Sequence, residues 1–342
     1  MLVKPFISMS LLSIIILVGV SGCDMRFKSE AILSEYIIDL SRSQFIAVDV
    51  PAIVMPISLP SRRDRQLALS QFDIGLLDFL SLQQCDVGIV AGKRNSILGK
   101  VMTDSQRFLY ELDIIRAIES CDVKDEVLSA ELNDIAKKKR LELPTVFGNA
   151  IINGEEASVF FSLSNGFLPL NYSTENQQDL LNALNRLVAI GENLVDLPKV
   201  DGRVFENDLK ILMDSEYGGR LLYSLAQLSR YLTSVSNNIG LLSSEVCGSP
   251  LAYLKQQFEQ HYVKKIQPYM GRINRSAYEV LPLLKRLIDL GVVGDEMKNF
   301  LNQFSLISTS SIWHRYQLAS QVHAKQWSRL FESCSVSLRS RS

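Results

Sequence analysis

Histidine is scarce in this chain, with only His261, His314 and His323 among 342 residues. No two of them lie four residues apart, and neither a His-Glu-x-x-His nor a Cys-x-x-Cys sequence occurs. The ligand spacings typical of zinc sites are therefore absent, and we expect no metal and no cofactor. A Ser-His-Asp triad assembles in space rather than in sequence, but the chain also lacks Gly-x-Ser-x-Gly and Ser-x-x-Lys. No catalytic residue is predicted.

An excess of charge is also missing, because 36 Lys and Arg residues balance 37 Asp and Glu residues. A nucleic-acid-binding protein normally carries a basic surplus, so we expect no nucleic acid partner. Residues 92–101 superficially resemble a phosphate-binding loop. However, six residues separate Gly92 from Gly99, and Val101 stands where Ser or Thr is needed. We therefore expect no nucleotide.

A hydrophobic run long enough to span a membrane is absent from the N-terminus. Lys4 is the only charged residue before Asp24, and the apolar run at 11–20 is about half of the roughly 20 residues that a span requires. A short apolar run followed by small residues is typical of a secretory signal. Val20-Ser21-Gly22-Cys23 resembles the lipobox of bacterial lipoproteins, in which the cysteine is acylated and becomes the new N-terminus.

We therefore predict that residues 1–22 are removed and that Cys23 carries the lipid. Several acyl chains anchor stably because each buried CH₂ contributes about 0.8 kcal/mol. Asp24 resembles the signal that keeps such proteins in the inner membrane, which favours the inner over the outer membrane. The prediction is a periplasm-facing envelope protein attached to the membrane. The alternatives are an uncleaved N-terminal anchor and a secreted protein in which Cys23 occurs by chance.

Four cysteines remain in the mature chain: Cys85, Cys121, Cys247 and Cys334. An even number in an oxidising compartment favours disulfides, and three pairings are open. We prefer the two local pairings, Cys85–Cys121 and Cys247–Cys334. The alternative is that at least one pair remains as buried free thiols.

Helical hydrophobic periodicity dominates the mature chain and predicts an all-α protein, an antiparallel bundle-like array of helices. Helices are predicted at 28–43, 62–84 and 124–140, among others, with an extended proline-rich strap at Pro51, Pro56 and Pro60. Glycine, proline and a β-favouring patch at 158–161 interrupt the pattern, so a small irregular or β-hairpin insertion is expected at 143–172. We expect a single domain at 23–342. The alternative is two helical halves, 23–142 and 173–342, joined by that segment.

Two basic segments are candidate sites. Arg62, Arg63 and Arg65 open a predicted helix, where positive charge opposes the helix dipole, so a partner is plausible. Arg94, Asn95 and Lys100 form a second candidate for an anion or partner patch. The alternative is a solvated surface with internal salt bridges. The leucine-rich stripe at 221–242 is interpreted as bundle core rather than a docking surface.

Several segments together resemble an uncharacterised family of Gram-negative lipoproteins, domain of unknown function 3080. They are residues 60–65 (PSRRDR), 94–100 (RNSILGK), 262–269 (YVKKIQPY) and 327–334 (WSRLFESC). The resemblance covers nearly the whole mature chain. It implies an envelope lipoprotein with a helical fold, and it implies no activity.

The expected function is a non-enzymatic binding or scaffolding role at the membrane, with an envelope protein as a candidate partner. The alternative is an enzyme or small-ligand carrier that acts on envelope material through a pocket between helices, for which 143–172 would form a lid. A deep polar pocket that gathers the histidines with carboxylates would favour the alternative.

Overall fold

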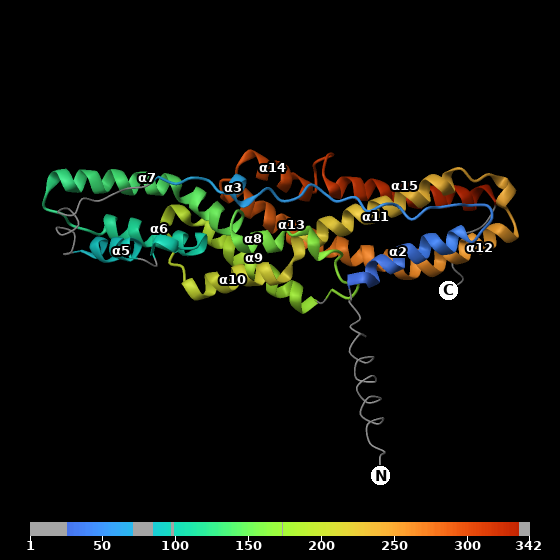
Figure 1. The fold of residues 1–342 in the computed structure, drawn as a ribbon, viewed down its shortest axis with the longest axis horizontal. Helices are drawn as coiled ribbons and strands as arrows, with labels where there is room; N and C mark the ends of the chain where they lie inside the picture. Colours follow the sequence, from blue (N-terminus) through green and yellow to red (C-terminus); the bar gives the residue numbers. More distant parts are fainter. Residues whose placement is uncertain (1–25, 71–84, 97–98, 173, 335–342) are drawn as a thin grey trace, which may run out of the picture.

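The computed structural model describes residues 26–70, 85–96, 99–172 and 174–334. Its helices pack side by side and end to end into one elongated body (Figure 1), and the described residues contain no strand. The predicted all-α class is confirmed.

One end of the body is formed by α5 (Asp86–Asn95), α6 (Asp104–Glu119) and the first half of α7 (Glu126–Ile151). These helices enclose a small hydrophobic cluster of their own, which includes Val87, Ile114 and Leu132. Thr103 caps α6, because its side chain accepts a hydrogen bond from the Gln106 backbone N–H. The short 3₁₀ turn η2 (Gly99–Val101) links α5 to α6.

The main hydrophobic core runs through the middle and the opposite end. Five elements follow α7 in the middle of the body. They are α8 (Glu155–Phe160), η3 (Leu163–Asn165), α9 (Thr174–Glu192), η4 (Leu194–Asp196) and α10 (Gly202–Ser215). Helix α10 packs on both α8 and α9. Helix α13 (Gln267–Leu290) packs on α9 and is followed by α14 (Asp295–Leu301) and η7 (Asn302–Phe304).

The opposite end is built around the pairing of α11 (Tyr217–Gly240) with α15 (Ile312–Ser333). The stripe at 221–242 supplies the buried residues Leu221, Leu225, Leu228 and Leu232, so its interpretation as core is confirmed. This end also contains α2 (Arg26–Ser41), η5 (Ser244–Val246), α12 (Ser249–Gln257) and η6 (Phe258–Ile266). The η6 segment is a π-helix that leads directly into Pro268 on α13.

The predicted proline strap is confirmed: residues 46–61 are extended and cross the body from the end of α2 to α3 (Arg62–Arg65) (Figure 1). Glutamine side chains hold its backbone. Gln227 donates to the Val54 carbonyl at 2.9 Å, and Gln303 both accepts from Ile57 N–H and donates to Ile57 C=O at 3.0 Å. These hydrogen bonds satisfy backbone groups of the strap, whose prolines prevent it from forming a helix.

Of the two forms expected for 143–172, the β-hairpin is wrong, whereas residues 161–172 are irregular apart from η3. Helix α7 continues through Pro144 to Ile151, and residues 155–160 form α8. Phe160 and Phe161 are 1% exposed. Phe161 packs on Phe300 and Phe304, and Phe160 packs on Phe161, so burial of these rings overrides their β propensity. The second half of α7 is buried as well, which stabilises the helix against the proline.

Gly219 makes this packing feasible. A Cβ atom at Gly219 would lie 2.0 Å from the Ser162 carbonyl oxygen, a backbone atom that cannot move aside cheaply. A Cβ atom at Gly218 would lie 2.8 Å from the rings of both Phe160 and Phe161. The two glycines therefore let α11 approach the end of α8 closely, which no side chain at these positions would allow.

The helix predicted at 62–84 ends much earlier than expected. Among its described residues, 62–70, only Arg62–Arg65 is helical, and the chain is extended from Gln66 to Ser70. The side chain of Asn149 on α7 accepts from Leu67 N–H and donates to Leu67 C=O, at 3.0 and 2.8 Å. These hydrogen bonds occupy the backbone groups that a continuing helix would use. Residues 71–84 lie outside the described residues.

Candidate functional site

The two basic segments that are candidate sites meet at one polar cavity of about 470 Å³. It lies where the extended chain after α3 passes α5, the start of α6 and the middle of α7. Arg63 and Arg94, one candidate from each basic segment, line it together with Arg107, which was not among the candidates from sequence. The other lining residues are Gln66, Leu67, Ala68, Leu69, Met102, Asp104 and Asn149.

The three arginines of the first segment have different environments. Arg62 is ion-paired with Asp104 at 3.2 Å and with Glu155. Arg65 is buried, and its Nη2 donates to the Ser158 hydroxyl at 2.7 Å. Arg63 is exposed, lines the cavity and has no hydrogen-bond or ion-pair partner among the described residues. Of the three, only Arg63 is available to a ligand.

Arg94 and Arg107 face the same cavity from α5 and α6. Burial lowers the pKa of Arg94, and the positive charge of Arg107 lowers that pKa further. Arg94 donates to the carbonyl of Gly99 in the turn that follows α5. The Nε atom of Arg107 is buried and has no hydrogen-bond partner. These two guanidinium groups are close enough to repel each other, so an anion between them would be stabilised.

A buried ion-pair network supports Arg107 from behind. Its Nη2 lies 2.5 Å from Oε1 of Glu111, whose Oε2 accepts from Lys139 at 2.6 Å. Arg107 and Lys139 also lie over the ring of Tyr110, at 5.4 and 6.0 Å from its centroid. Arg107 stands four residues before Glu111, so in sequence the pair resembles an ordinary ion pair along a helix. Only the fold turns Arg107 toward the cavity.

One carboxylate also lines the cavity. Burial raises the pKa of the Asp104 carboxyl, while the neighbouring Arg62 lowers it. Asp104 also accepts a hydrogen bond from Gln66. Around the cavity, Arg63, Arg94, Arg107 and Lys139 thus stand against Asp104 and Glu111, which leaves a positive balance.

The remaining predicted residues are placed only in part. Asn95 ends α5 and Lys100 lies in η2, but their side chains are not among those described. Cys23 and Asp24 lie outside the described residues.

Both predicted disulfides are present. Cys85 and Cys121 are bonded, with Cα atoms 5.6 Å apart, and they join the start of α5 to the end of α6. Cys247 and Cys334 are bonded with Cα atoms 5.5 Å apart, and they join the segment before α12 to the end of α15. The local pairing is confirmed.

The histidines do not meet in a pocket. His323 is fully buried on α15, and its Nε2 accepts a hydrogen bond from Trp327 Nε1 at 3.2 Å and contacts the Tyr36 hydroxyl at 3.2 Å. Burial lowers the pKa of His323 to about 3. His261 on η6 contacts Asp39 Oδ2 at 2.8 Å, and His314 is exposed. His323 is therefore a hydrogen-bonded core histidine.

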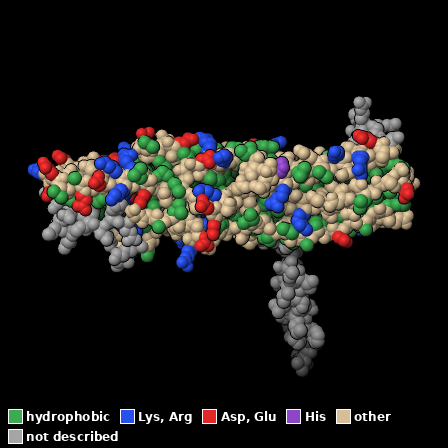
Figure 2. All heavy atoms as spheres, turned by 90° about the horizontal axis from the view of Figure 1, so that it is seen from above, with side chains coloured by type: hydrophobic (Ala, Val, Ile, Leu, Met, Phe, Trp, Pro, Cys, Tyr) green, Lys and Arg blue, Asp and Glu red, His purple; other side chains and the backbone are tan. Residues whose placement is uncertain are grey.

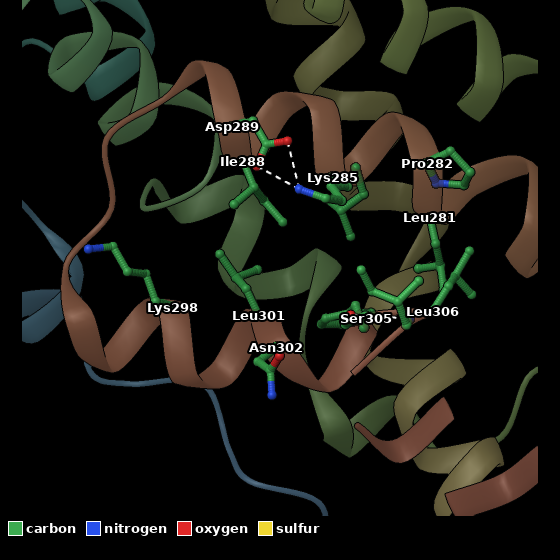
Figure 3. Close-up of a pocket in the computed structure, with 13 residues that line it drawn as sticks. Leu281, Pro282, Lys285, Ile288, Asp289, Lys298, Leu301, Asn302, Ser305 and Leu306 are labelled. Atoms are coloured by element: carbon green, nitrogen blue, oxygen red, sulfur yellow. Dashed lines mark hydrogen bonds and ion pairs between the residues drawn. The ribbon is translucent and has the colours of Figure 1, made fainter. Parts of the chain in front are cut away.

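A second hollow lies between α13 and the α14–η7 segment, with a volume of about 460 Å³. Figure 3 shows Ile288, Leu301 and Leu306 directed into it, with the Lys285–Asp289 ion pair at its edge. Its lining is mainly apolar, so we call it the apolar groove. Neither the groove nor the arginine cavity is lined by a histidine.

The described residues hold neither a metal-binding cluster nor a membrane-spanning helix. In the part of the chain that the structure describes, no group of three or more His, Cys, Asp or Glu residues is placed to hold a metal ion. Among the helices in that same part, none has both the length and the apolar character that a membrane span requires.

Comparison with known proteins places the chain in a family. No curated protein and no solved structure matches it. One family model, described as a protein of unknown function (DUF3080), matches residues 33–338, which is most of the chain. The matched region includes every element from α3 to α15, both disulfides and the arginine cavity. The chain therefore belongs to the DUF3080 family.

Proposed function

We propose that this protein is a lipid-anchored lipoprotein of the bacterial envelope that faces the periplasm and binds an anionic envelope component without catalysing a reaction. Two features support the location: the Val20-Ser21-Gly22-Cys23 sequence and the two disulfides, which suit an oxidising compartment. Asp24 favours the inner membrane. An envelope protein with an acidic surface is the candidate partner.

The arginine cavity is the observation that carries the binding role. Arg63, Arg94 and Arg107 come from three separate elements, and only one carboxylate, Asp104, shares the wall with them. Guanidinium groups bind carboxylate and phosphate groups through paired, charge-assisted hydrogen bonds. No histidine or cysteine nucleophile accompanies them in the cavity wall, so the arrangement suits binding.

Replacing Cys23 with alanine removes the acyl attachment site. We expect complete loss of labelling by a radioactive or alkyne-bearing fatty acid, because no other residue would accept the lipid. The measurement is metabolic labelling followed by purification of the chain, with Cys121→Ala as a control that retains the label. Undiminished labelling of the Cys23 variant would refute the anchor.

Replacing Arg63 with glutamine should weaken the binding of a small anion by about tenfold or more, because a hydrogen bond to a charged group contributes about 1.5–3 kcal/mol. Isothermal titration with inorganic phosphate measures the affinity. Lys93→Gln is the matched control, since Lys93 lies beside Arg94 on α5, is exposed and is not part of the cavity wall. Phosphate affinity that is equal in the Arg63 and Lys93 variants, or absent in the unchanged chain, contradicts the site.

The apolar groove favours a second candidate function, a carrier of small apolar ligands. Its volume of about 460 Å³ lies within the range typical of ligand pockets, roughly 300–1,000 Å³. Leu301 projects into it (Figure 3), so Leu301→Trp should fill the space. Saturable binding of a fluorescent fatty acid that this substitution abolishes would favour the carrier over the anion-binding role.

A further inference from the structure

The start of α2 lies next to a positively charged part of the helix pair η6–α13. Helix α2 runs antiparallel to this pair, as two contacts show: His261 meets Asp39 at 2.8 Å, and Lys265 meets Glu35 at 2.8 Å. Because positions rise on one helix as they fall on the other, the first turn of α2 lies beside residues near 272. The Leu168 carbonyl confirms this register, since it accepts hydrogen bonds from both Ser29 on α2 and Tyr269 on α13.

Five exposed cations gather along this edge, and we call them the basic face. They are Lys28, Lys264, Lys265, Arg272 and Arg275. Four of them have no ion-pair partner among the described residues; the fifth, Lys265, pairs with Glu35.

The surface between these cations is not covered by neighbouring groups and is partly apolar. A Cβ atom at Gly271 would meet nothing within 4 Å, so no neighbouring group covers this part of α13. Ile38 on α2 is 49% exposed, and Val263 on η6 is 39% exposed. Cations interspersed with exposed apolar side chains are typical of surfaces that lie at a membrane interface.

The nearby carboxylates do not neutralise the basic face. Glu35 is the exposed acid within it, and it is engaged by Lys265. Asp39 is engaged by Arg42 and His261, and Glu259 lies 3.9 Å from Lys255. Glu279, farther along α13, accepts a hydrogen bond from the neutral Gln177, so Glu279 and the half-buried Glu30 on α2 are acids without a cation partner among the described residues. They are outnumbered by the four cations of the basic face that have no ion-pair partner in the same part of the chain. The chain is nearly neutral as a whole, with a formal charge of −1, but its charge is locally unbalanced here.

The chain length before α2 limits where an attached lipid can lie. Helix α2 begins at Arg26, three residues after Cys23. Three residues span at most roughly 11 Å, so a lipid on Cys23 lies within that distance of the first turn of α2. The membrane surface is therefore brought to the edge of the body that carries the basic face. The proline strap runs along the length of the body, above α2 in the view of Figure 1.

We infer that the basic face binds the headgroups of anionic lipids and holds the elongated body against the bilayer to which the lipid is attached. This inference extends the proposed lipid anchor by adding a second, electrostatic contact. A lipid anchor alone allows the body to rotate about a short tether. Phosphate groups under Lys264, Arg272 and Arg275 would restrict that rotation.

Vesicle sedimentation tests this surface apart from the anchor. The probe is the full chain with Cys23→Ala, mixed with vesicles of phosphatidylcholine alone or with a third of phosphatidylglycerol. In this background, one variant carries Lys264→Gln, Lys265→Gln, Arg272→Gln and Arg275→Gln. The matched control carries Lys124→Gln, Lys199→Gln, Arg203→Gln and Arg315→Gln, which removes four exposed cations elsewhere. The signal segment is common to all three chains, so differences between them report the substituted surface.

We expect the parent chain and the control to bind the anionic vesicles, and the first variant to bind them at least roughly tenfold more weakly, since each surface cation contributes about 1 kcal/mol near an anionic membrane. High salt should remove the difference. Equal partitioning of the two variants would overturn the inference, as would equal binding of the parent chain to both kinds of vesicle. Failure of the lipid anchor would instead be detected by absence of acyl label on Cys23 and would leave the vesicle result unaffected.

Discussion

Replacing Cys247 and Cys334 together with serine lowers the free energy of unfolding by about 4–5 kcal/mol. The bond closes a loop with a sequence separation of 87 residues, and the entropy that it removes from the unfolded chain grows with loop length. Urea unfolding of the oxidised protein and of the variant measures the difference. This is a large share of the 5–15 kcal/mol that stabilises a typical domain.

The other disulfide is the internal comparison. Cys85 and Cys121 are separated by 36 residues, so the corresponding double serine variant should lose somewhat less, about 3–4 kcal/mol. That loss should fall mainly on the small cluster between α5, α6 and α7, which this bond borders. Unchanged urea midpoints in both variants, or in the reduced wild-type protein, would contradict the prediction that the two disulfides stabilise the fold by lowering the entropy of the unfolded chain.

Acid should destabilise the protein through His323. Burial lowers its pKa to about 3 in the folded chain, whereas an unfolded histidine titrates near 6.5. Between these values the unfolded state binds more protons than the folded state, so stability falls as the pH falls from about 6.5 toward 3. From pH 7 to pH 4.5 this group should remove about 2–3 kcal/mol of unfolding free energy, at about 1.4 kcal/mol per pH unit.

The contribution of His323 is isolated by comparing variants. Carboxylates also titrate in acid, so wild type and His323→Gln are both unfolded in urea at pH 7 and pH 4.5. The variant should lose about 2–3 kcal/mol less than wild type over this range, because glutamine does not titrate. His314→Gln should behave like wild type, since His314 is exposed. Identical losses in all three proteins would contradict the assignment.

His323 also shows why a buried histidine in this family need not be catalytic. Its Nε2 accepts a hydrogen bond from Trp327, which places the proton of the neutral ring on Nδ1, and Nδ1 is buried without a partner. The surrounding rings of Tyr36, Phe258 and Tyr262 fill the space around it. These contacts make His323 part of the packing where α2, η6 and α15 meet.

The proposed orientation gives one edge of the elongated body a role at the membrane. The basic face lies where α2 runs along η6–α13, and the strap passes above α2 in the view of Figure 1. The face seen in Figure 2 shows acidic and basic side chains intermixed, without an extended area of one sign. A membrane contact through the basic face would leave this mixed surface to the periplasm.

Hydrophobic spacing was sufficient to predict the helical class, and it failed where packing outweighed local preference. Phe160 and Phe161 favour strands in isolation, but both rings are buried at the end of a helix, where Phe161 packs on Phe300 and Phe304. Pro144 marks a helix end in sequence, yet it lies inside α7 because the residues after it are buried. Residues 66–70 continue a helical pattern, but the Asn149 amide takes the backbone groups of Leu67.

The arginine cavity shows a similar limit. Arg63 and Arg94 were candidates because their segments are rich in basic residues, whereas Arg107 looked like half of a helical ion pair. Arg62 and Arg65 were equally basic in sequence, and neighbouring side chains engage them instead. The basic face could not be found from net charge, because its members come from two segments more than 200 residues apart.

The sequence by itself determined the all-α class, the proline strap, the local pairing of four cysteines and the buried stripe of α11, because each depends on spacing along the chain. Tertiary structure alone decided which arginines face a common cavity and which cations share an edge with the start of α2. Those features depend on the antiparallel register of distant helices, and register is set by the packing of side chains that local patterns do not reveal.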